Sequence, residues 1–396
     1  MGKGALEGIR IIDLSNVIAG PFSANILADF GAEVIKIEMP GKGDSFRAMG
    51  PFLNGKSIRW DSMSRNKKLI TLDLHFEKGK ELFLELVAKS DVVIENFRTG
   101  TLEKWGIGME VLKKANPNII VTHITGYGQT GPNSTLAGFG TPCTAFSGVT
   151  YLMGYPDRAP ISPSFSLADY VAGMNAVIGT MIALYHRDAL HGPGQEVDVA
   201  LYEGLFRMME TIVAEYQLTG KIRQRTPKMS GSASPSNTFK TKDDKWIVLV
   251  CSTNRTFEYL TNAMKRRDLL EKYADTPARL ADDDFITKVT GDWISSLDYA
   301  ELKEICHREG VPIDLIYSIE DIFEDPQYAS RNDIVKIPSE EFGTTAMPAV
   351  TPVLSETPGE IKWAGQHMGA HNDEIYLNLL GLDKEKYQKL KEDSVI

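Results

Sequence analysis

A carboxylate that could do covalent chemistry stands at the junction of a short polar segment and a long apolar one. Asp169 opens the apolar part, which runs to residue 185. Apolar side chains recur there at helical spacing, which predicts a buried helix with Asp169 in its first turn; they are Val171, Met174, Ile178, Met181, Ile182 and Tyr185. The spacing of Ser166 and Asp169 also fits a capping box. A helix N-terminus favours the ionised form, and a partly desolvated carboxylate can act as a covalent nucleophile. The segment alone leaves both roles open.

Basic residues are concentrated in residues 36–68, although the whole chain carries a net charge of −10. The acids in this stretch are only Glu38, Asp44 and Asp61. A basic segment in an acidic protein indicates either a site for a small polyanion or a solvated surface. The basic residues are Lys36, Lys42, Arg47, Lys56, Arg59, Arg65, Lys67 and Lys68.

Two glycine patterns resemble phosphate-binding loops. Residues 50–57, GPFLNGKS, match the P-loop pattern, but no apolar strand precedes them and Pro51 removes a backbone donor. Residues 126–131, GYGQTG, match the dinucleotide pattern and follow a predicted strand, but Pro132 stands where a helix should open. We expect neither a nucleotide hydrolase nor a nicotinamide enzyme.

Composition limits the possible partners. A length of 396 residues, with 42% hydrophobic and 24% charged residues, is typical of a soluble protein of two or three domains. The negative net charge argues against a general nucleic-acid binder. Cys143, Cys251 and Cys306 lie far apart and form no metal-ligand pattern. We therefore expect no metal. No apolar run reaches about 18 residues, so we also expect no membrane partner and a cytoplasmic location.

Strands and helices alternate through the first 200 residues. The pattern predicts strands at 9–14, 34–37, 69–74, 92–95, 119–125 and 196–200, with helices at 21–30 and 77–89 between them. This order is typical of a doubly wound, Rossmann-like α/β domain with a parallel sheet. We therefore expect the first part of a large α/β domain in residues 1–200 and a linker helix in 201–225. A smaller α+β domain with a hairpin at 238–250 follows in 226–329, and residues 330–396 rejoin the large domain.

Four spaced segments resemble one known family. They are residues 6–44 (LEGIRIIDLSNVIAGPFSANILADFGAEVIKIEMPGKGD), 91–100 (DVVIENFRTG), 126–132 (GYGQTGP) and 369–375 (GAHNDEI). Together with the segment around Asp169, they resemble the family III CoA-transferases, the group of formyl-CoA transferase and carnitine CoA-transferase. The resemblance covers essentially the whole chain. It implies an interlocked homodimer in which two ring-like chains thread through one another.

The resemblance also implies the reaction. Asp169 matches the family's nucleophile, which forms a mixed anhydride with an acyl-CoA and then an aspartyl-CoA thioester, before CoA passes to a small carboxylic acid. Coenzyme A would thus be substrate and product, and no metal is needed. Residues 230–234 match a loop that closes over the site in relatives. The positions that match CoA contacts are Ile18, Ala19, Leu72, Asn96, Phe97, Arg98, Lys104, Gly138 and Phe139.

Two departures from the family pattern bear on the substrate. Ile18 stands where formyl-CoA transferase has glutamine, which argues against an oxalate and formyl-CoA pair. Met39 replaces an arginine, so we expect Lys36 or Lys42 to supply the missing cation, and Arg47 is a candidate for binding a dicarboxylate or hydroxyacid. The alternative is an α-methylacyl-CoA racemase of the same fold. That chemistry needs a histidine within residues 138–146, where this chain has none.

Overall fold

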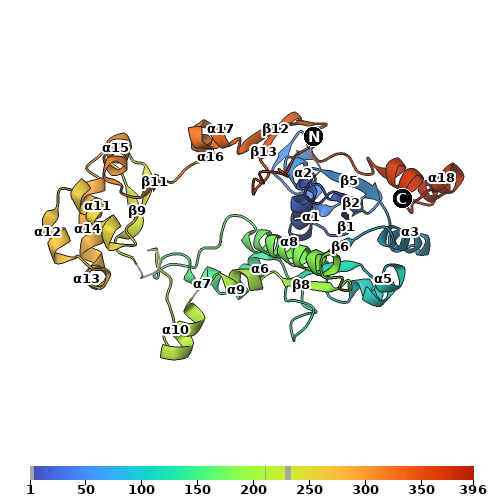
Figure 1. The fold of residues 1–396 in the computed structure, drawn as a ribbon, viewed down its shortest axis with the longest axis horizontal. Helices are drawn as coiled ribbons and strands as arrows, with labels where there is room; N and C mark the ends of the chain where they lie inside the picture. Colours follow the sequence, from blue (N-terminus) through green and yellow to red (C-terminus); the bar gives the residue numbers. More distant parts are fainter. Residues whose placement is uncertain (1–3, 210, 228–232) are drawn as a thin grey trace. The chain divides into compact units, whose positions relative to one another are not determined.

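The computed structural model describes residues 4–209, 211–227 and 233–396. They form two compact units (Figure 1). The large unit combines Met1–Thr150, Ser162–Lys221 and Ala329–Ile396, and the small unit combines Tyr151–Ile161 with Ile222–Tyr328. The boundaries expected at 226 and 329 lie close to this division, which adds residues 151–161 to the small unit. The C-terminal segment Ala329–Ile396 belongs to the large unit.

A parallel six-stranded sheet forms the centre of the large unit. Its order is β5-β2-β1-β6-β7-β8, and every pair is parallel. The predicted parallel α/β architecture is therefore confirmed. Both faces of the sheet are covered, so the strands are apolar on both sides. The strands are β1 (Arg10–Asp13), β2 (Glu33–Glu38), β5 (Lys67–Thr71), β6 (Val92–Glu95), β7 (Ile120–Thr125) and β8 (Glu196–Ala200).

Alternate strand residues enter two separate cores. Ile11 points into one, packed by α1 (Ala19–Asp29) and α8 (Leu167–Asp188). Ile12 points into the other, packed by α3 (Glu77–Val87), α5 (Met109–Ala115) and α18 (Lys384–Glu392), which lie together in Figure 1. Shorter helices lie in the loops: α2 (Arg59–Met63), α4 (Thr101–Lys104), α6 (Gly140–Phe146), α7 (Val149–Leu152), α9 (Glu203–Arg207), α10 (Ile212–Thr219) and the 3-10 turn Ser45–Ala48.

The C-terminal segment covers β5, which is an edge strand of the sheet. His371 Nδ1 accepts a hydrogen bond from the Leu69 N–H at 3.0 Å. Asn372 Oδ1 accepts from the Thr71 N–H at 2.9 Å, and the Tyr376 hydroxyl donates to the Thr71 carbonyl at 2.6 Å. The motif at residues 369–375 thus satisfies edge groups that would otherwise be unpaired. The remaining elements here are β12 (Ile334–Ser339), β13 (Gly343–Pro348) and the π-helical turn Glu374–Leu379.

Helix α8 differs from the expectation in the face that it buries. Apart from Val171, the apolar residues predicted to lie in the core are outside it: Ile178 is 57% exposed and Ile182 and Tyr185 are each 64% exposed. Small residues such as Ala172 and Ala176 fill the buried face against α1 and β7 instead. The sequence prediction failed because this helix is apolar on both faces. Its length and hydropathy also match a membrane span, which was not expected, but its small residues pack as in a core helix.

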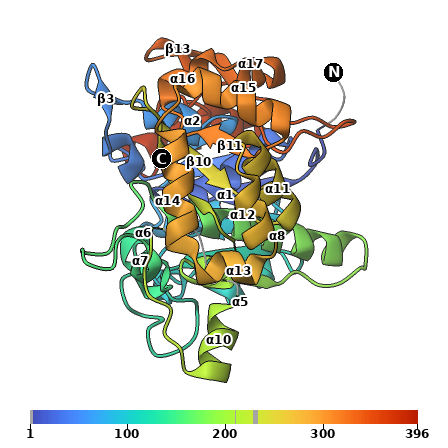
Figure 2. The same cartoon turned by 90° about the vertical axis from the view of Figure 1, so that its left-hand side faces the viewer.

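The small unit has a sheet of three strands, β9 (Ser236–Lys240), β10 (Trp246–Val250) and β11 (Ile313–Leu315). The hairpin of β9 and β10 confirms the predicted one. Helices pack with this sheet around one core (Figure 2). They are α11 (Asn254–Ala263), α12 (Arg267–Lys272), α13 (Thr276–Ala281), α14 (Asp283–Ile294) and α15 (Tyr299–Glu309). Two further helices, α16 (Ile319–Glu324) and α17 (Pro326–Arg331), follow β11 in the chain.

The P-loop pattern is a hairpin. Strands β3 (Phe52–Leu53) and β4 (Lys56–Ser57) pair antiparallel across the turn Asn54–Gly55. Lys56, the residue that would bind phosphate in a P-loop, makes an ion pair with Glu341 at 2.8 Å. The second pattern, residues 126–131, runs into a loop and opens no helix. Neither pattern therefore forms the phosphate-binding motif that its letters match.

Candidate active site

The loops after β1 and β6 meet where the order of the sheet reverses, which is where open α/β sheets bind ligands. Asn16 follows β1 and Asn96 follows β6. The Asn96 amide donates to the Asn16 carbonyl at 2.7 Å, and its Oδ1 accepts from the Asn16 N–H at 2.7 Å. This reciprocal pair fixes the two loops against each other and sets the floor of a site.

Four buried charges hold the loop after β1 in place. Lys67 Nζ lies 2.9 Å from Asp13 Oδ2, and Lys36 Nζ lies 2.8 Å from Asp44 Oδ2 and 3.7 Å from Asp13 Oδ1. Lys36 also donates to the Ser15 carbonyl. Burial alone would raise the pKa of Asp13, but the two lysines hold it below its usual value. Because Lys36 is fully buried, the prediction that it is a candidate to replace the cation lost at Met39 is wrong.

Val17 has an unusual backbone within this loop. Its φ of 68° lies in the left-handed region, which a β-branched residue rarely adopts. Asp44 accepts a hydrogen bond from the Val17 N–H at 3.0 Å, so the charge cluster stabilises the conformation. Strained backbone of this kind is concentrated at functional sites.

A cavity of about 190 Å³ opens above these loops, and Asp169 is part of its wall. We call it the Asp169 cavity. The structure brings together there Asp169 and seven of the nine residues selected as CoA contacts: Ile18, Ala19, Asn96, Phe97, Arg98, Gly138 and Phe139. Asn16, Thr99, Ser134 and Leu136 also line it and were missed, since short loop segments give no periodic signal.

The glycine at the end of β7 shapes one wall of the Asp169 cavity. A Cβ added to Gly126 would lie 2.5 Å from the Gly138 Cα, and one added to Gly138 would lie 2.2 Å from the Gly126 Cα. The two backbones touch, so no side chain fits at either position. The first glycine of the pattern at 126–131 therefore lets the segment carrying Phe139 approach the sheet.

The Asp169 carboxylate lies close to the backbone of Gly140, and within the described residues it has no partner for its charge. Ser166 is the N-cap of α8 but makes no side-chain capping bond, so the predicted capping box is absent. Within the described residues, the Asp169 carboxylate makes no ion pair or hydrogen bond with another side chain. A Cβ at Gly140 would lie 1.8 Å from Asp169 Oδ2, so glycine alone leaves the carboxylate in this position. Burial raises the pKa of Asp169 to about 6.

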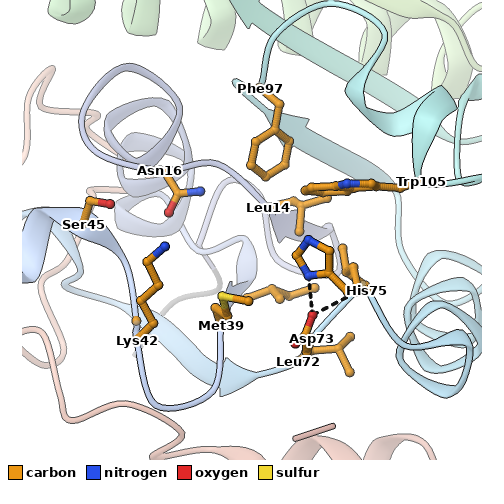
Figure 3. A pocket seen from close by; sticks show the side chains of 13 residues that line it. Leu14, Asn16, Met39, Lys42, Ser45, Leu72, Asp73, His75, Phe97 and Trp105 are labelled. Carbon is orange, nitrogen blue, oxygen red and sulfur yellow. Dashed lines mark hydrogen bonds and ion pairs between the residues drawn. The ribbon is translucent and has the colours of Figure 1, made fainter.

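A second cavity, of about 350 Å³, continues from the first, because Asn16 and Phe97 line both. Phe97 and Trp105 pack edge to face at 5.0 Å, and His75 packs on Trp105 at 5.6 Å. Figure 3 shows these rings at one end and the Lys42 ammonium at the other. We call it the Trp105 cavity. The predicted contact Leu72 lines it, as do Met39 and Lys42, whereas Lys104 lies outside it, exposed and next to Trp105.

Most cations of residues 36–68 serve the fold. Arg47 binds Glu38 through two nitrogens, at 2.7 and 2.8 Å, and stacks on Trp60. The prediction that Arg47 is a spare cation for a substrate is therefore wrong. Lys36, Lys56, Arg65, Lys67 and Lys68 also form ion pairs. In the described part of the chain, Lys42 and Arg59 are the members of this segment without such a partner. The segment 230–234, predicted to close over the site, falls largely outside the described residues.

Comparison with known proteins identifies the family of this chain. The family model described as CoA-transferase family III matches residues 6–372. The chain is 43% identical to the succinyl-CoA–L-malate CoA-transferase beta subunit of Chloroflexus aurantiacus, over 99% of this chain and 98% of that one. It is 38% identical to the succinyl-CoA–D-citramalate CoA-transferase of the same organism, over 99% and 98%. It is 32% identical to the acetyl-CoA:oxalate CoA-transferase of Acetobacter aceti, over 84% and 86%.

A comparison with solved structures also finds a similar fold. A crystal structure of a CAIB/BAIF family protein from Brucella suis superposes with a TM-score of 0.84 at 29% identity, covering 96% of this chain and all of that one. Matches of this length and identity in sequence, together with the shared fold, agree with the motifs that the sequence presented. The chain belongs to CoA-transferase family III and is a CoA-transferase.

Proposed function

We propose that this enzyme moves CoA from an acyl-CoA thioester to a carboxylic acid through covalent intermediates on Asp169. The observation that carries the proposal is the state of this carboxylate at the wall of the Asp169 cavity: it is half-buried, its pKa is raised, and within the described residues no other side chain pairs with it. A carboxylate stripped of its hydration shell is a stronger nucleophile than one in water.

Each step exchanges one activated acyl group for another. An Asp169 oxygen attacks the thioester carbonyl carbon, the C–S bond breaks, and CoA leaves as a thiolate with an acyl-aspartyl anhydride behind it. The thiolate attacks the Asp169 carbonyl carbon of the anhydride and releases the donor as a carboxylate. The acceptor carboxylate then attacks the aspartyl-CoA thioester, its C–S bond breaks, and a second anhydride forms as CoA leaves again as a thiolate. The thiolate attacks the acceptor acyl carbon of this anhydride, which forms the new acyl-CoA and breaks the bond to the Asp169 oxygen. Asp169 is restored and no net proton is consumed.

The two connected cavities suit the two ends of acyl-CoA. We assign the nucleotide end to the Trp105 cavity, whose rings can stack on a base and whose Lys42 can bind phosphate. The thioester end then enters the Asp169 cavity past Asn16 and Phe97. Arg98 and Lys104, exposed along this route, remain further candidates for the phosphates.

The acyl partners are proposed from relatives and tested by a screen. Relatives are named for succinyl-CoA as donor and for L-malate or D-citramalate as acceptor. Purified enzyme is incubated with a panel of acyl-CoA donors and carboxylic acids, and new acyl-CoA species are identified by mass spectrometry. Transfer to at least one acid supports the proposal. A panel that includes these compounds and yields only hydrolysis, or no reaction, would reject it.

The racemase alternative is not favoured. Removing and returning a proton at an α-carbon requires an acid and a base on opposite sides of it. No histidine of the described residues lines the Asp169 cavity. The neighbouring thiol of Cys143 is fully buried, and its pKa is raised to about 11 by burial and by the charge of Asp169, so it stays protonated.

Activity is expected to fall in acid. The nucleophile must be ionised, and burial raises the pKa of Asp169 to about 6. The protonated fraction grows as pH falls through that value, so kcat/KM should lose about tenfold per pH unit below it and level off above it. A pH–rate profile measured at subsaturating donor concentrations, with a fixed acceptor that is stable over the pH range, gives this limb. A profile that stays flat down to pH 4.5 would contradict the assignment.

We also propose that a second copy of the chain covers the exposed face of α8. Met174, Ile178, Met181, Ile182 and Tyr185 form one apolar stripe on this helix. Large contiguous apolar surfaces on soluble proteins mark interaction sites. The interlocked homodimer implied by the family resemblance provides a partner for this face without a further protein.

The dimer is expected to persist at nanomolar concentration and to depend on α8. Replacing Ile182 by glutamate places a charge on the apolar stripe, while its exposure predicts little effect on the separate chain. Light scattering should therefore report loss of the dimer in this variant. Lys113→Glu, an exposed change on α5, is the matched control and should remain dimeric. A wild-type protein that is monomeric and folded in this measurement would refute the proposal.

A further inference from the structure

A third cavity, of about 420 Å³, lies between residues of α2 and the residues around the start of α8. We call it the Arg59 cavity. Its polar side chains are Arg59, Ser62, Thr141, Ser164, Ser166 and Tyr170, and Phe46, Met63, Pro163 and Phe165 complete the wall. An aliphatic chain would gain little by entering such a wall, because burying hydroxyls against it costs free energy. The cavity instead suits a polar ligand.

The position of this cavity relative to the nucleophile follows from its neighbours in the chain. Ser166 is the N-cap of α8, and Tyr170 comes directly after Asp169 in the same first turn. Thr141 follows Gly140, whose Cβ position lies 1.8 Å from Asp169 Oδ2. Residues close to the nucleophile in the chain, and Thr141 next to Gly140, therefore line the Arg59 cavity, which places it beside the segment that carries Asp169.

The Arg59 cavity has an unneutralised positive charge. Within the described residues, Arg59 makes no ion pair and no hydrogen bond, unlike Arg47, Arg65 and Lys67 of the same segment. Burial raises the pKa of the Tyr170 phenol, and the charge of Arg59 opposes that rise. Within the described residues Arg59 does not pair with Asp169 either, so its guanidinium is available to a ligand.

The hydroxyls around Arg59 are equally without partners. In the described part of the chain, the side chains of Ser62, Thr141, Ser164 and Ser166 form no hydrogen bond, and no carboxylate lines the cavity. A guanidinium with nearby free hydroxyl donors is a suitable receptor for a carboxylate, which accepts several hydrogen bonds and matches the guanidinium in a bidentate pair.

We infer that the Arg59 cavity binds the distal carboxylate of a dicarboxylic acyl group whose other end reacts at Asp169. The inference rests on the proposed function and gives it a substrate class: short dicarboxylic acids, as donor acyl group and as acceptor. Donor and acceptor occupy the same place in turn, so one arginine serves both halves of the reaction. It also corrects the expectation that Arg47 would have this task.

The test compares two donors of equal chain length. Succinyl-CoA carries the distal carboxylate and butyryl-CoA lacks it. Initial rates of CoA transfer to one fixed acceptor acid, followed by chromatography of the acyl-CoA species, give kcat/KM for each donor and report on the attack by Asp169. In Arg59→Met, the ratio of kcat/KM for succinyl-CoA over butyryl-CoA should fall by about 10- to 100-fold, the effect of one lost charge-assisted contact. Arg59→Lys should recover part of the ratio, and Lys113→Met, on the exposed side of α5, should leave it unchanged.

The outcomes separate this inference from the proposed function. If Arg59→Met lowers kcat/KM equally for both donors, Arg59 contacts the CoA moiety and the inference fails while the proposed function stands. If the variant keeps the wild-type ratio, the inference also fails. If the wild type transfers CoA from no donor, the proposed function fails, and the inference fails with it. Thermal unfolding of each variant shows that the fold is retained, since Arg59 is exposed and unpaired.

Discussion

Replacing Asp169 by asparagine is expected to abolish CoA transfer. Asparagine has nearly the same shape, so CoA should still bind in the two connected cavities, but its amide is a very poor nucleophile. We expect kcat to fall by at least about 10³-fold, as for other residues that form a covalent intermediate. Steady-state kinetics measures the loss, and calorimetric titration with CoA measures retained binding. Turnover near the wild-type rate would remove Asp169 from the mechanism.

The same variant should be more stable than the wild type near pH 8. Burial raises the pKa of Asp169 from 3.8 to about 6, so the folded chain holds an unfavourable charge above pH 6. Asparagine removes this charge, which should add about 2–3 kcal/mol to the free energy of unfolding at pH 8 and nothing below about pH 4. A carboxylate acting as a helix cap predicts the opposite sign, a loss of about 1 kcal/mol. Denaturant unfolding at both pH values separates the two.

Replacing Lys67 by methionine is expected to cause the largest loss of stability. Lys67 is fully buried, with Nζ 2.9 Å from Asp13 Oδ2 and 2.6 Å from the Pro21 carbonyl. Methionine would leave Asp13 and Asp44 with only Lys36 between them. Breaking a buried pair in this way costs about 3–5 kcal/mol, because the remaining charge is buried without compensation.

The neighbouring Lys68 provides a matched control. It also forms ion pairs, with Glu33 and Glu374, but its side chain is 21% exposed. Exposed pairs contribute at most about 1 kcal/mol, so Lys68→Met should be mild. Urea unfolding at one fixed protein concentration compares the two, since an oligomer's stability depends on concentration. Equal losses in both variants would mean that the Asp13 cluster does not hold the loop as described.

Local patterns in the sequence predicted the parallel sheet and the helices between its strands. The apolar runs around Ile11, Val92 and Val121 led to the parallel strands, because buried parallel strands are apolar on both faces and alternate with helices. The same reasoning placed Asp169 correctly at the start of a helix. It also rejected the false P-loop at residues 50–57, since that pattern lacked its flanking strand.

Features that depend on distant partners were not predictable. The charges of Lys36 and Arg47 looked available for a ligand, but each is neutralised by a residue whose contact only folding creates, Asp44 and Glu38. Periodicity could not tell which apolar face of α8 is buried, because both are apolar. The Arg59 cavity was missed since its residues come from separate loops. In the sequence these residues are one cation and scattered serines, and no regular spacing between them marks a site.

The most direct measurement is to trap the enzyme during turnover. Wild-type enzyme is mixed with succinyl-CoA, quenched with hydroxylamine and digested, and peptides are identified by mass spectrometry. An acyl-activated aspartate should yield a hydroxamate on the peptide that carries Asp169, and Asp169→Asn treated identically should yield none. Borohydride should reduce the same activated carbon. If an actively transferring enzyme gives no modification at Asp169, or gives it at another residue, the covalent mechanism proposed here is wrong.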